Sequence, residues 1–495
     1  MSLGQILEES CRKYPENVAI INENISLTYR ELNKAVNAVG NHLTSLGLQK
    51  GDKVALLLGD CPEFIISYFA AQKIGAVAVT LNIMSTAYEL RYLIGNSETK
   101  VLITEYQMIS SFKEISADVP LCRHLIFTDG PDDGSSFRNI VEKGPFILDI
   151  PEINGDDPAV MIYTAGLTGN PLGATLTHRN LLGQSNLIRD LCGGTEKDRA
   201  VCVIPFFHSF GAVVNMLGAI RIGAGVVLLD RFTIDSLFKA VEKDKITYIA
   251  AVPRVFLGML LQKETEHYNL RSLRLCITGG AAMPVEFITP FEEKFDIKLV
   301  EGYGLTEASP VCTFSRLDMP QKPGSIGVAI PGVEAKIVDD DGKEASTGEV
   351  GELIVTGENV MKGYYKDEEA TAQVIRNGWL YTSDLAKIDE DGYIFITGRK
   401  KRMIINSGFN VYPREVEIVI DMHPAVKASQ VFGAPNLLRG EVVRALVVKN
   451  EGAEIDGRTI IRHCRKYLSP YKVPRKVEFV ENLENPPSPP FSKGG

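Results

Sequence analysis

The stretch KVALLLGDCPEFIISYFAAQKIGAVAVTLN, residues 53–82, decides the fold class. It opens with a short apolar run (53–59), continues through a helical pattern (64–75) and ends in a second apolar run (76–82). Short runs that are apolar on both faces and alternate with helices are typical of a parallel sheet covered on both sides. The same alternation returns at 159–163, 200–206, 225–230, 248–252 and 273–280. The sequence therefore predicts an α/β fold.

Farther along the chain the pattern changes to short strands and tight turns. Between about residues 320 and 400, Asp-Gly and Asp-Asp-Gly turns separate the strand patterns 334–343, 351–357 and 387–398, which predicts hairpins. A compact α+β segment follows residue 401, and ENPPSPPFSKGG (484–495) is rich enough in Pro, Gly and Ser to predict disorder. The boundaries expected from these changes are 1–400, 401–483 and 484–495.

Composition excludes several classes of protein. The 495 residues carry a net charge of −9 and are 45% hydrophobic, which is ordinary for a globular protein and argues against binding nucleic acid or anionic membrane with the whole surface. Residues 401–495 hold 15 basic against 10 acidic residues, a net of +5, which either indicates an anionic ligand or arises by chance. Eight scattered cysteines and an N-terminus without a signal-peptide pattern predict a cytoplasmic protein. The apolar stretch 211–229 contains Asn215 and Arg221, so we expect a buried helix and strand and no transmembrane segment.

Three segments contain residues suited to binding a nucleotide. In YTAGLTGNPLG (163–173), three glycines and two threonines between a strand and a helix can bind anionic oxygens, although a tight turn explains the glycines equally well. In EGYGLTE (301–307), Tyr303 can face a base, Thr306 a phosphate and Glu307 a Mg²⁺ ion; alone, Glu307 is more often a solvated acid. In the segment 379–401, Asp384 could bridge two ribose hydroxyls and Arg399 could bind phosphate or ribose, unless the two form an ordinary surface ion pair.

Taken in order, these segments resemble the adenylate-forming (AMP-forming) superfamily, which includes acyl-CoA synthetases, firefly luciferase and the adenylation domains of peptide synthetases. Four further segments share the resemblance: 205–210, 324–334, 357–365 and 402–417. The resemblance is greatest to the fatty-acyl-CoA ligase branch. It implies a large N-terminal domain of layered αβαβα sheets with a small β-barrel-like subdomain, followed by a small mobile α+β C-terminal domain. It also implies that a small-molecule carboxylic acid, in this branch a fatty acid, reacts with ATP to give acyl-AMP and pyrophosphate, and that coenzyme A then displaces AMP.

The resemblance also implies roles for individual residues. It assigns Thr306 to the α-phosphate, Glu307 to Mg²⁺, His208 to the acyl site, Arg399 to the ribose and Lys401 to the hinge of the C-terminal domain. For His208, a core histidine remains the alternative. The residues implied to bind the nucleotide or coenzyme A are Thr164, Gly166, Thr168, Gly169, Gly280, Ala281, Glu301, Gly302, Tyr303, Gly304, Asp384 and Gly408.

The sequence departs from the family pattern where the phosphates of ATP are expected. Ala165, Leu167 and Leu172 replace the usual Ser, Thr and Lys, and each lost charge-assisted contact costs roughly 1.5–3 kcal/mol. After Leu483 the family pattern continues Pro-Lys-Thr-x-x-Gly-Lys with a catalytic lysine, whereas this sequence reads ENPPSPPFSKGG. We therefore expect a fatty-acid–CoA ligase with impaired adenylation. The alternatives are an aryl- or other carboxylate–CoA ligase and a non-catalytic protein that binds a nucleotide or an acyl-adenylate.

Overall fold

The computed structural model describes residues 1–23, 25–130, 136–165, 169–400, 403–436 and 439–483. The chain forms two compact units. The first consists of residues 1–83, 94–163 and 173–400, and the second of residues 84–93, 164–172 and 401–495. The disorder predicted for the tail concerns residues 484–495, which lie outside the described residues.

Residues 53–82 fold as a β-α-β unit within the first unit. Strand β3 (Lys53–Leu57) leads into helix α3 (Pro62–Lys73), which begins with proline at its first turn, and then into β4 (Val77–Thr80). The strands β3 and β4 are parallel, with Leu56 opposite Thr80, so the predicted parallel α/β arrangement is confirmed. They belong to a seven-stranded sheet in the order β18-β8-β7-β4-β3-β5-β6. Its other strands are β5 (Thr99–Thr104), β6 (His124–Phe127), β7 (Pro158–Ala165), β8 (Pro171–Thr177) and β18 (Gly363–Tyr364).

A second, nine-stranded sheet has the order β15-β14-β13-β12-β11-β9-β10-β1-β2. Its central strands run parallel, so their carboxyl ends meet at one edge of the sheet. The strands are β1 (Val18–Asn22), β2 (Ile25–Thr28), β9 (Arg199–Val201), β10 (Gly225–Leu228), β11 (Tyr248–Ala251), β12 (Leu275–Thr278), β13 (Lys298–Gly304), β14 (Val311–Phe314) and β15 (Val328–Ala329).

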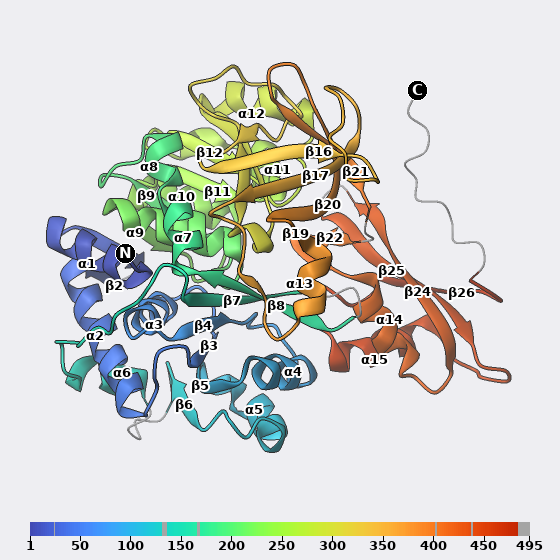
Figure 1. Cartoon of the computed structure of the whole chain (residues 1–495), viewed down its shortest axis with the longest axis horizontal. Coiled ribbons are helices and arrows are strands. Elements are labelled where there is room, and N and C mark those ends of the chain that lie inside the picture. Colours follow the sequence, from blue (N-terminus) through green and yellow to red (C-terminus); the bar gives the residue numbers. More distant parts are fainter. Residues whose placement is uncertain (24, 131–135, 166–168, 401–402, 437–438, 484–495) are drawn as a thin grey trace. The chain divides into compact units, whose positions relative to one another are not determined.

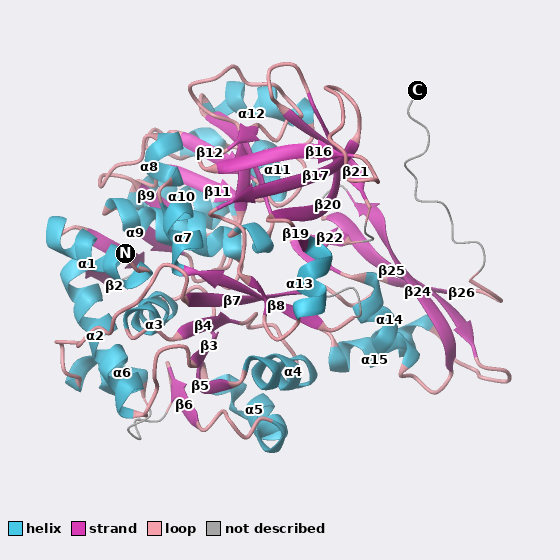
Figure 2. Cartoon of the chain, viewed as in Figure 1, coloured by secondary structure: helices cyan, strands magenta, loops and turns pink. Residues whose placement is uncertain are grey.

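Helices α1 (Leu3–Lys13), α2 (Tyr29–Ser45), α3 and α6 (Phe137–Lys143) gather in one part of the first unit (Figure 2). Helix α2 begins where Thr28 and Glu31 cap each other's backbone, a sequence signal for a helix start. The side chain of Lys73 is fully buried on α3, where its ammonium group donates to Asn33 (2.6 Å) and Asn37 (2.8 Å) on α2 and pairs with Glu8 on α1. These bonds compensate the cost of burying the charge.

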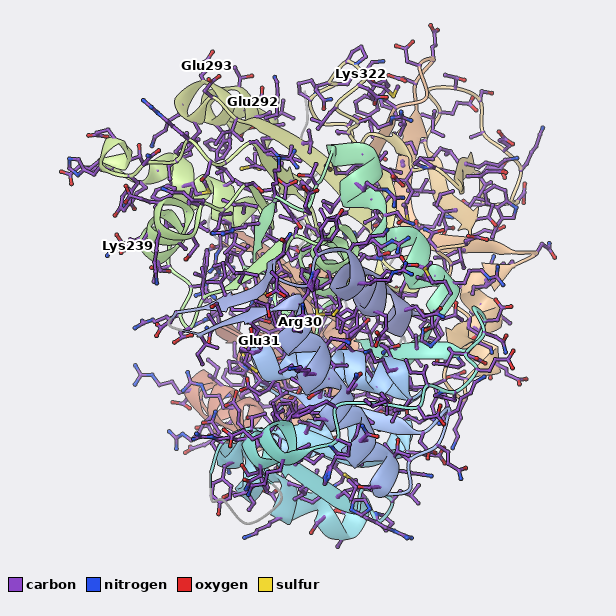
Figure 3. The ribbon with its side chains drawn as sticks, turned by 90° about the vertical axis from the view of Figure 1, so that its left-hand side faces the viewer. Arg30, Glu31, Lys239, Glu292, Glu293 and Lys322 are labelled. Carbon is purple, nitrogen blue, oxygen red and sulfur yellow. The ribbon has the colours of Figure 1, made fainter. Side chains whose placement is uncertain are left out.

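The helices that cover the nine-stranded sheet are amphipathic. Helix α10 (Ile234–Asp244) buries Leu237, Phe238 and Val241 in the core and leaves Lys239 exposed. Figure 3 shows Lys239, and also Glu292 and Glu293 of α12 (Ile288–Phe295), on the outer side of their helices. The other helices are α4 (Ala87–Ser97), α5 (Ile109–Ile115), α7 (His178–Ser185), α8 (Leu187–Cys192), α9 (Gly218–Ile222), α11 (Pro253–Leu261), α13 (Glu368–Val374), α14 (Pro413–Asp421) and α15 (Gly457–Tyr467).

The apolar stretch 211–229 is a buried helix followed by a strand, as predicted. A π-helical segment, Gly211–Leu217, continues into α9 and then into β10. A search of the described residues found no helix that is both long and apolar enough to cross a membrane.

The predicted hairpins between residues 320 and 400 form an antiparallel sheet. Strands β16 (Val333–Val338), β17 (Gly351–Gly357), β20 (Trp379–Ile388) and β19 (Ile375–Arg376) lie in that order, and β21 (Ile394–Arg399) pairs with β20. Figure 1 shows β16, β17 and β20 side by side. This sheet brings Asp384 opposite Arg399, which the sequence places 15 residues apart.

The second unit has its own sheet and core. Strands β22 (Ile404–Asn406), β23 (Phe409–Val411), β24 (Val426–Asn436), β25 (Gly440–Lys449) and β26 (Lys476–Phe479) form the sheet, and α14 and α15 pack with it around a shared apolar core (Figure 1). Within this unit the buried Lys472 ammonium lies 2.7 Å from a carboxylate oxygen of Glu89 and 2.5 Å from one of Glu415. The predicted α+β character of the C-terminal region is confirmed.

Candidate functional site

The segment 301–307 lies where strand β13 leaves the nine-stranded sheet. Glu301 is buried there and its carboxylate accepts the Met283 N–H (3.3 Å), which ties β13 to the loop that follows β12. Burial raises the pKa of Glu301 to about 7. Residues 302–307 are partly exposed, so this loop is accessible from solvent although both of its flanks are buried. The structure thus gives Glu301 a supporting role for the loop.

The glycines of this region allow close approach between backbone segments. A Cβ at Gly304 would lie 2.0 Å from the Pro310 carbonyl oxygen, and one at Gly279 would lie 3.0 Å from the Gly302 carbonyl oxygen. A Cβ at Gly302 would lie 3.3 Å from the Phe314 ring. Packing within the protein therefore requires Gly304 whatever ligand binds. Gly280 is exposed and Ala281 half-buried in the loop after β12, beside Gly279.

Tyr303, Asp384 and Arg399 form one hydrogen-bonded network in the first unit. The Tyr303 hydroxyl donates to Asp384 Oδ2 (2.6 Å), and Arg399 Nε donates to Asp384 Oδ1 (2.7 Å). Asp384 is 9% exposed, and its two partners compensate the burial of its carboxylate. Burial and the neighbouring Asp384 raise the pKa of Tyr303 well above its usual value, so the phenol stays protonated. The structure brings together three residues that the sequence analysis selected from segments about 80 residues apart.

The backbone around Asp384 is held in an unusual conformation. Ser383 has φ +63°, in the left-handed region, and its N–H donates to Glu352 (2.9 Å). The neighbouring Thr382 hydroxyl donates to the Leu353 carbonyl (2.7 Å). Both bonds run from β20 to β17, so the antiparallel sheet fixes the position of Asp384. Glycine adopts a left-handed φ more readily than serine does, so the backbone of Ser383 is strained.

Thr306 and Glu307 lie in a single 3₁₀ turn, Thr306–Ala308. The Thr306 hydroxyl has a long contact with the Ser209 hydroxyl (3.4 Å), which connects the 301–307 loop to the segment of His208. The Tyr364 hydroxyl donates to Glu307 Oε1 (2.8 Å) and so orients that carboxylate. Ser209 and Tyr364 are not among the residues predicted from the sequence. Both lie inside segments that resemble the family, which was the available signal, but no spacing in the sequence connects them to Thr306 or Glu307.

His208 lies in a tight turn between β9 and the π-helical segment. Its N–H donates to the Pro205 carbonyl (3.0 Å), and its Nδ1 accepts the Phe210 N–H (3.3 Å). Because Nδ1 accepts a hydrogen bond, the neutral ring carries its proton on Nε2. Burial lowers the pKa of His208 to about 4, so the ring is neutral near pH 7. The Phe210 ring lies against Gly279, at the edge where β12 ends. The structure therefore places His208 and Thr306 in adjoining segments.

The remaining predicted residues belong to the second unit or lie outside the described residues. Thr164 is on β7, Gly169 has φ +96°, and both belong to the second unit. Gly408 follows Ser407 between β22 and β23, and both have positive φ (+89° and +58°), as a two-residue hairpin turn of type I′ requires. This turn gives Gly408 a structural role in addition to the predicted one near coenzyme A. Gly166, Thr168 and Lys401 lie outside the described residues.

The site of the first unit contains groups that are chemically suited to a sugar, a phosphate and a cation. Asp384 offers carboxylate oxygens, Thr306 a hydroxyl donor, and Glu307 a carboxylate next to that hydroxyl. Among the described residues there is no group of three His, Cys, Asp or Glu side chains that could bind a metal by itself. A single carboxylate fits Mg²⁺, which usually binds one or two protein carboxylates together with phosphate oxygens.

Comparisons with known proteins show which family the chain resembles over its length. The family model of AMP-binding enzymes matches residues 7–365, and the model of the AMP-binding enzyme C-terminal domain matches residues 415–488. A long-chain-fatty-acid–CoA ligase of Bacillus subtilis (strain 168) is 36% identical over 97% of this chain and 91% of its own. A feruloyl-CoA synthase of an Amycolatopsis species is 33% identical over 99% of this chain and 98% of its own.

Solved structures give the same result. A double mutant of o-succinylbenzoate-CoA synthetase from Bacillus subtilis, bound with a product analogue, superposes with a TM-score of 0.87 and 27% identity. The match covers 98% of this chain and 96% of that structure. Because the two family models and the full-length relatives together span nearly the whole sequence, the chain belongs to the family of AMP-binding enzymes, among the AMP-forming acyl-CoA ligases.

Proposed function

We propose that the protein joins a carboxylic acid to coenzyme A in two steps. A carboxylate oxygen attacks the α-phosphorus of ATP and pyrophosphate leaves; the thiol sulfur of coenzyme A then attacks the acyl carbon, AMP leaves, and the thiol proton passes to solvent. The observation that carries the proposal is the Tyr303–Asp384–Arg399 network, because it presents a fixed carboxylate beside an aromatic ring that precedes Thr306 in the same loop.

Each residue of the site has a role in this reaction. Asp384 accepts hydrogen bonds from two ribose hydroxyls, and Arg399 holds the Asp384 carboxylate in place. The ring of Tyr303 contacts adenine beside Gly280, Ala281, Gly302 and Gly304. Thr306 donates to the α-phosphate, where negative charge develops as the carboxylate attacks. His208, neutral and protonated on Nε2, donates to the acyl group.

The cofactor Mg²⁺ fits the carboxylate of Glu307, which Tyr364 orients. When bound, Mg²⁺ neutralises negative charge on the phosphates of ATP. Thr164, Gly166, Thr168 and Gly169 are proposed to bind the outer phosphates, and Gly408 to leave room for coenzyme A. Lys401 is proposed as the hinge before a C-terminal domain of residues 401–483.

We propose a fatty acid as the substrate. The relative from Bacillus subtilis is named a long-chain-fatty-acid–CoA ligase, and the helix after Phe210 buries an almost wholly apolar run. An aryl acid is the second candidate, because the feruloyl-CoA synthase covers as much of the chain. Incubating the protein with ATP, Mg²⁺, coenzyme A and single acids tests this choice, with the acyl-CoA measured by mass spectrometry. Dodecanoate and hexadecanoate should exceed ferulate and benzoate; a preference for the aryl acids would select the second candidate.

We further propose that this chain forms the acyl-adenylate slowly. Leu172 cannot supply the cation that a lysine gives to the phosphates, and residues 484–495 do not contain the Gly-Lys pair of the family pattern. Appending a Pro-Lys-Thr-x-x-Gly-Lys segment after Leu483 should raise ATP–pyrophosphate exchange roughly 100- to 1,000-fold, the size of effect seen when one such donor is removed. The matched control carries alanine in place of the last lysine. If both extended proteins exchange at the rate of the original chain, the tail does not limit adenylation.

A further inference from the structure

The segment that carries His208, residues 204–209, is held by side chains from the seven-stranded sheet of the first unit. This segment follows β9 of the nine-stranded sheet. The Phe206 N–H donates to Asp60 Oδ1 (2.8 Å), and the Thr80 hydroxyl donates to the Phe207 carbonyl (3.1 Å). Asp60 follows β3 and Thr80 ends β4, so both come from the carboxyl ends of two adjacent parallel strands. Two consecutive residues before His208 are therefore fixed through their backbone from the seven-stranded sheet.

Keeping the Asp60 side chain ionised at this buried position costs free energy. Burial raises the pKa of Asp60 to about 6, although the Phe206 N–H and the Cys202 thiol both favour its charged form. The titratable groups nearby are few in the described part of the chain. The Cys202 thiol faces Asp60 and is neutral, because burial raises its own pKa far above the usual value. Glu63 and Glu105 act on the neighbouring Cys61, whose pKa burial also raises.

A neutral side chain at residue 60 could accept the same N–H with less desolvation cost. The carboxylate gives a stronger, charge-assisted bond, which fixes the Phe206 backbone more tightly. His208 is fixed relative to Phe206 because both lie in one turn, in which the His208 N–H donates to the Pro205 carbonyl (3.0 Å). Ser209, which contacts Thr306, follows in the same segment.

We propose that Asp60 is a positioning residue for the acyl end of the site: its carboxylate fixes the backbone of residues 204–209 so that His208 and Ser209 are aligned with the acyl-adenylate. This inference rests on the proposed function. Asp60 acts through the segment and does not itself touch the substrate.

The test compares two ligands on four proteins by isothermal titration calorimetry. The ligands are dodecanoyl-sulfamoyl-adenosine, a stable analogue of an acyl-adenylate, and AMP, which lacks the acyl group. The proteins are the wild type, Asp60→Ala, Asp60→Asn and the control Glu63→Gln, which removes a carboxylate from the same stretch and leaves the Phe206–Asp60 bond intact. Asp60→Ala should weaken binding of the acyl ligand roughly 10-fold, because the buried Phe206 N–H loses its acceptor next to the acyl end of the proposed site. Binding of AMP should change little.

The pH dependence separates positioning from a general loss of structure. Affinity of the wild type for the acyl ligand should fall as the pH drops through about 6, where Asp60 gains its proton. His208 titrates near pH 4 and so adds a separate, more acidic step. Asp60→Asn should show no step near 6 and should bind the acyl ligand with an intermediate affinity, weaker than the wild type at neutral pH and tighter than Asp60→Ala, because its amide oxygen accepts the N–H without a charge and does not titrate. Glu63→Gln should behave as the wild type does.

Two results would overturn the proposal: the step near pH 6 persists in Asp60→Asn, or Asp60→Ala weakens AMP and the acyl ligand equally. Failure of the proposed function would look different. In that case the wild type itself would bind the acyl ligand no more tightly than AMP, and His208→Ala would leave both affinities unchanged.

Discussion

The region around Asp384 and the segment 163–173 both belong to the expected nucleotide site, yet they differ in how much of the family pattern they retain. Around Asp384 the acid, the arginine and the tyrosine are all present and hydrogen-bonded to one another. In the segment 163–173, Ala165, Leu167 and Leu172 replace two hydroxyl groups and a cation. The first region suits binding of the base and sugar, which both half-reactions need. The second would act on the outer phosphates, which only the first half-reaction uses.

The difference implies that nucleotide binding and adenylation can be lost separately. The site proposed for AMP consists of groups that are buried and paired in the first unit. Adenylation depends in addition on positive charge at the leaving pyrophosphate, where electrostatic stabilisation gives a large part of the rate. The following predictions test each side of this contrast.

Removing the acid at the centre of the network should have the largest effect. Asp384→Ala deletes the acceptor of two ribose hydroxyls and leaves Arg399 without this partner, so AMP should bind roughly 100-fold more weakly. Calorimetry with AMP measures the change. Asp340→Ala serves as the control, because Asp340 is an exposed acid of the same unit that pairs with Lys400. If Asp384→Ala binds AMP as tightly as the wild type, Asp384 does not bind the ribose.

Restoring the cation of the other region should have the next largest effect. Leu172→Lys should raise ATP–pyrophosphate exchange roughly 10-fold, since a lysine can pair with the phosphates, while AMP binding stays unchanged. Leu172→Met is the matched control, because it is as long and flexible but uncharged. If Leu172→Met gives the same gain as Leu172→Lys, charge at this position is not what the loop lacks.

The buried carboxylate of Glu301 should lower the stability of the folded protein at neutral and alkaline pH. The pKa of Glu301 is about 7 in the folded protein against 4.5 for the free group, so the folded state binds its proton more tightly. Glu301 therefore destabilises the fold progressively as the pH rises from about 4.5 to about 7, and the loss is complete above that range. Glu301→Gln should raise the free energy of unfolding by about 1–3 kcal/mol at pH 8 and much less at pH 5. Equal effects at both pH values in denaturant titrations would contradict the raised pKa.

The smallest effect is expected beside Asp384. Ser383 has a left-handed φ of +63°, which strains a residue that has a Cβ atom. Ser383→Gly removes this strain and should stabilise the protein by about 1 kcal/mol. Thermal unfolding measures the change, and AMP affinity should be unaffected, because the Asp384 contacts remain. Ser383→Ala keeps the strained backbone and should give no such gain. A lower melting temperature for Ser383→Gly would show that the serine side chain matters more than the strain.

The sequence predicted those parts of the protein that depend on local pattern. Residues 53–82 predicted a β-α-β unit because the apolar runs are short and the helix between them is continuous, and β3, α3 and β4 confirm it. The pairing of Asp384 with Arg399 was open at the level of the residues alone: a surface ion pair was the alternative, and the structure shows an ion pair that also holds Tyr303.

Other parts depend on contacts between distant segments and could not be predicted. Asp60 is hydrogen-bonded to Phe206, 146 residues away in the sequence, and Tyr364 to Glu307, 57 residues away. Both contacts form because two different sheets end near each other. The periodicity of apolar residues in a sequence does not predict contacts between segments that are this far apart. The glycines were likewise ambiguous: Gly304 is required by the Pro310 carbonyl and Gly408 by a hairpin turn, whichever ligands these positions also serve.

The contrast between the two regions is tested most directly by measuring both half-reactions on the same protein. One assay follows ATP–pyrophosphate exchange with dodecanoate, and the other follows conversion of preformed dodecanoyl-AMP and coenzyme A to dodecanoyl-CoA. We predict that the thioester forms at least about 10-fold faster than exchange occurs, because Leu172 stands where the family pattern has a lysine that is proposed to act on the first step alone. Exchange as fast as thioester formation, or no thioester from the preformed adenylate, would contradict this account.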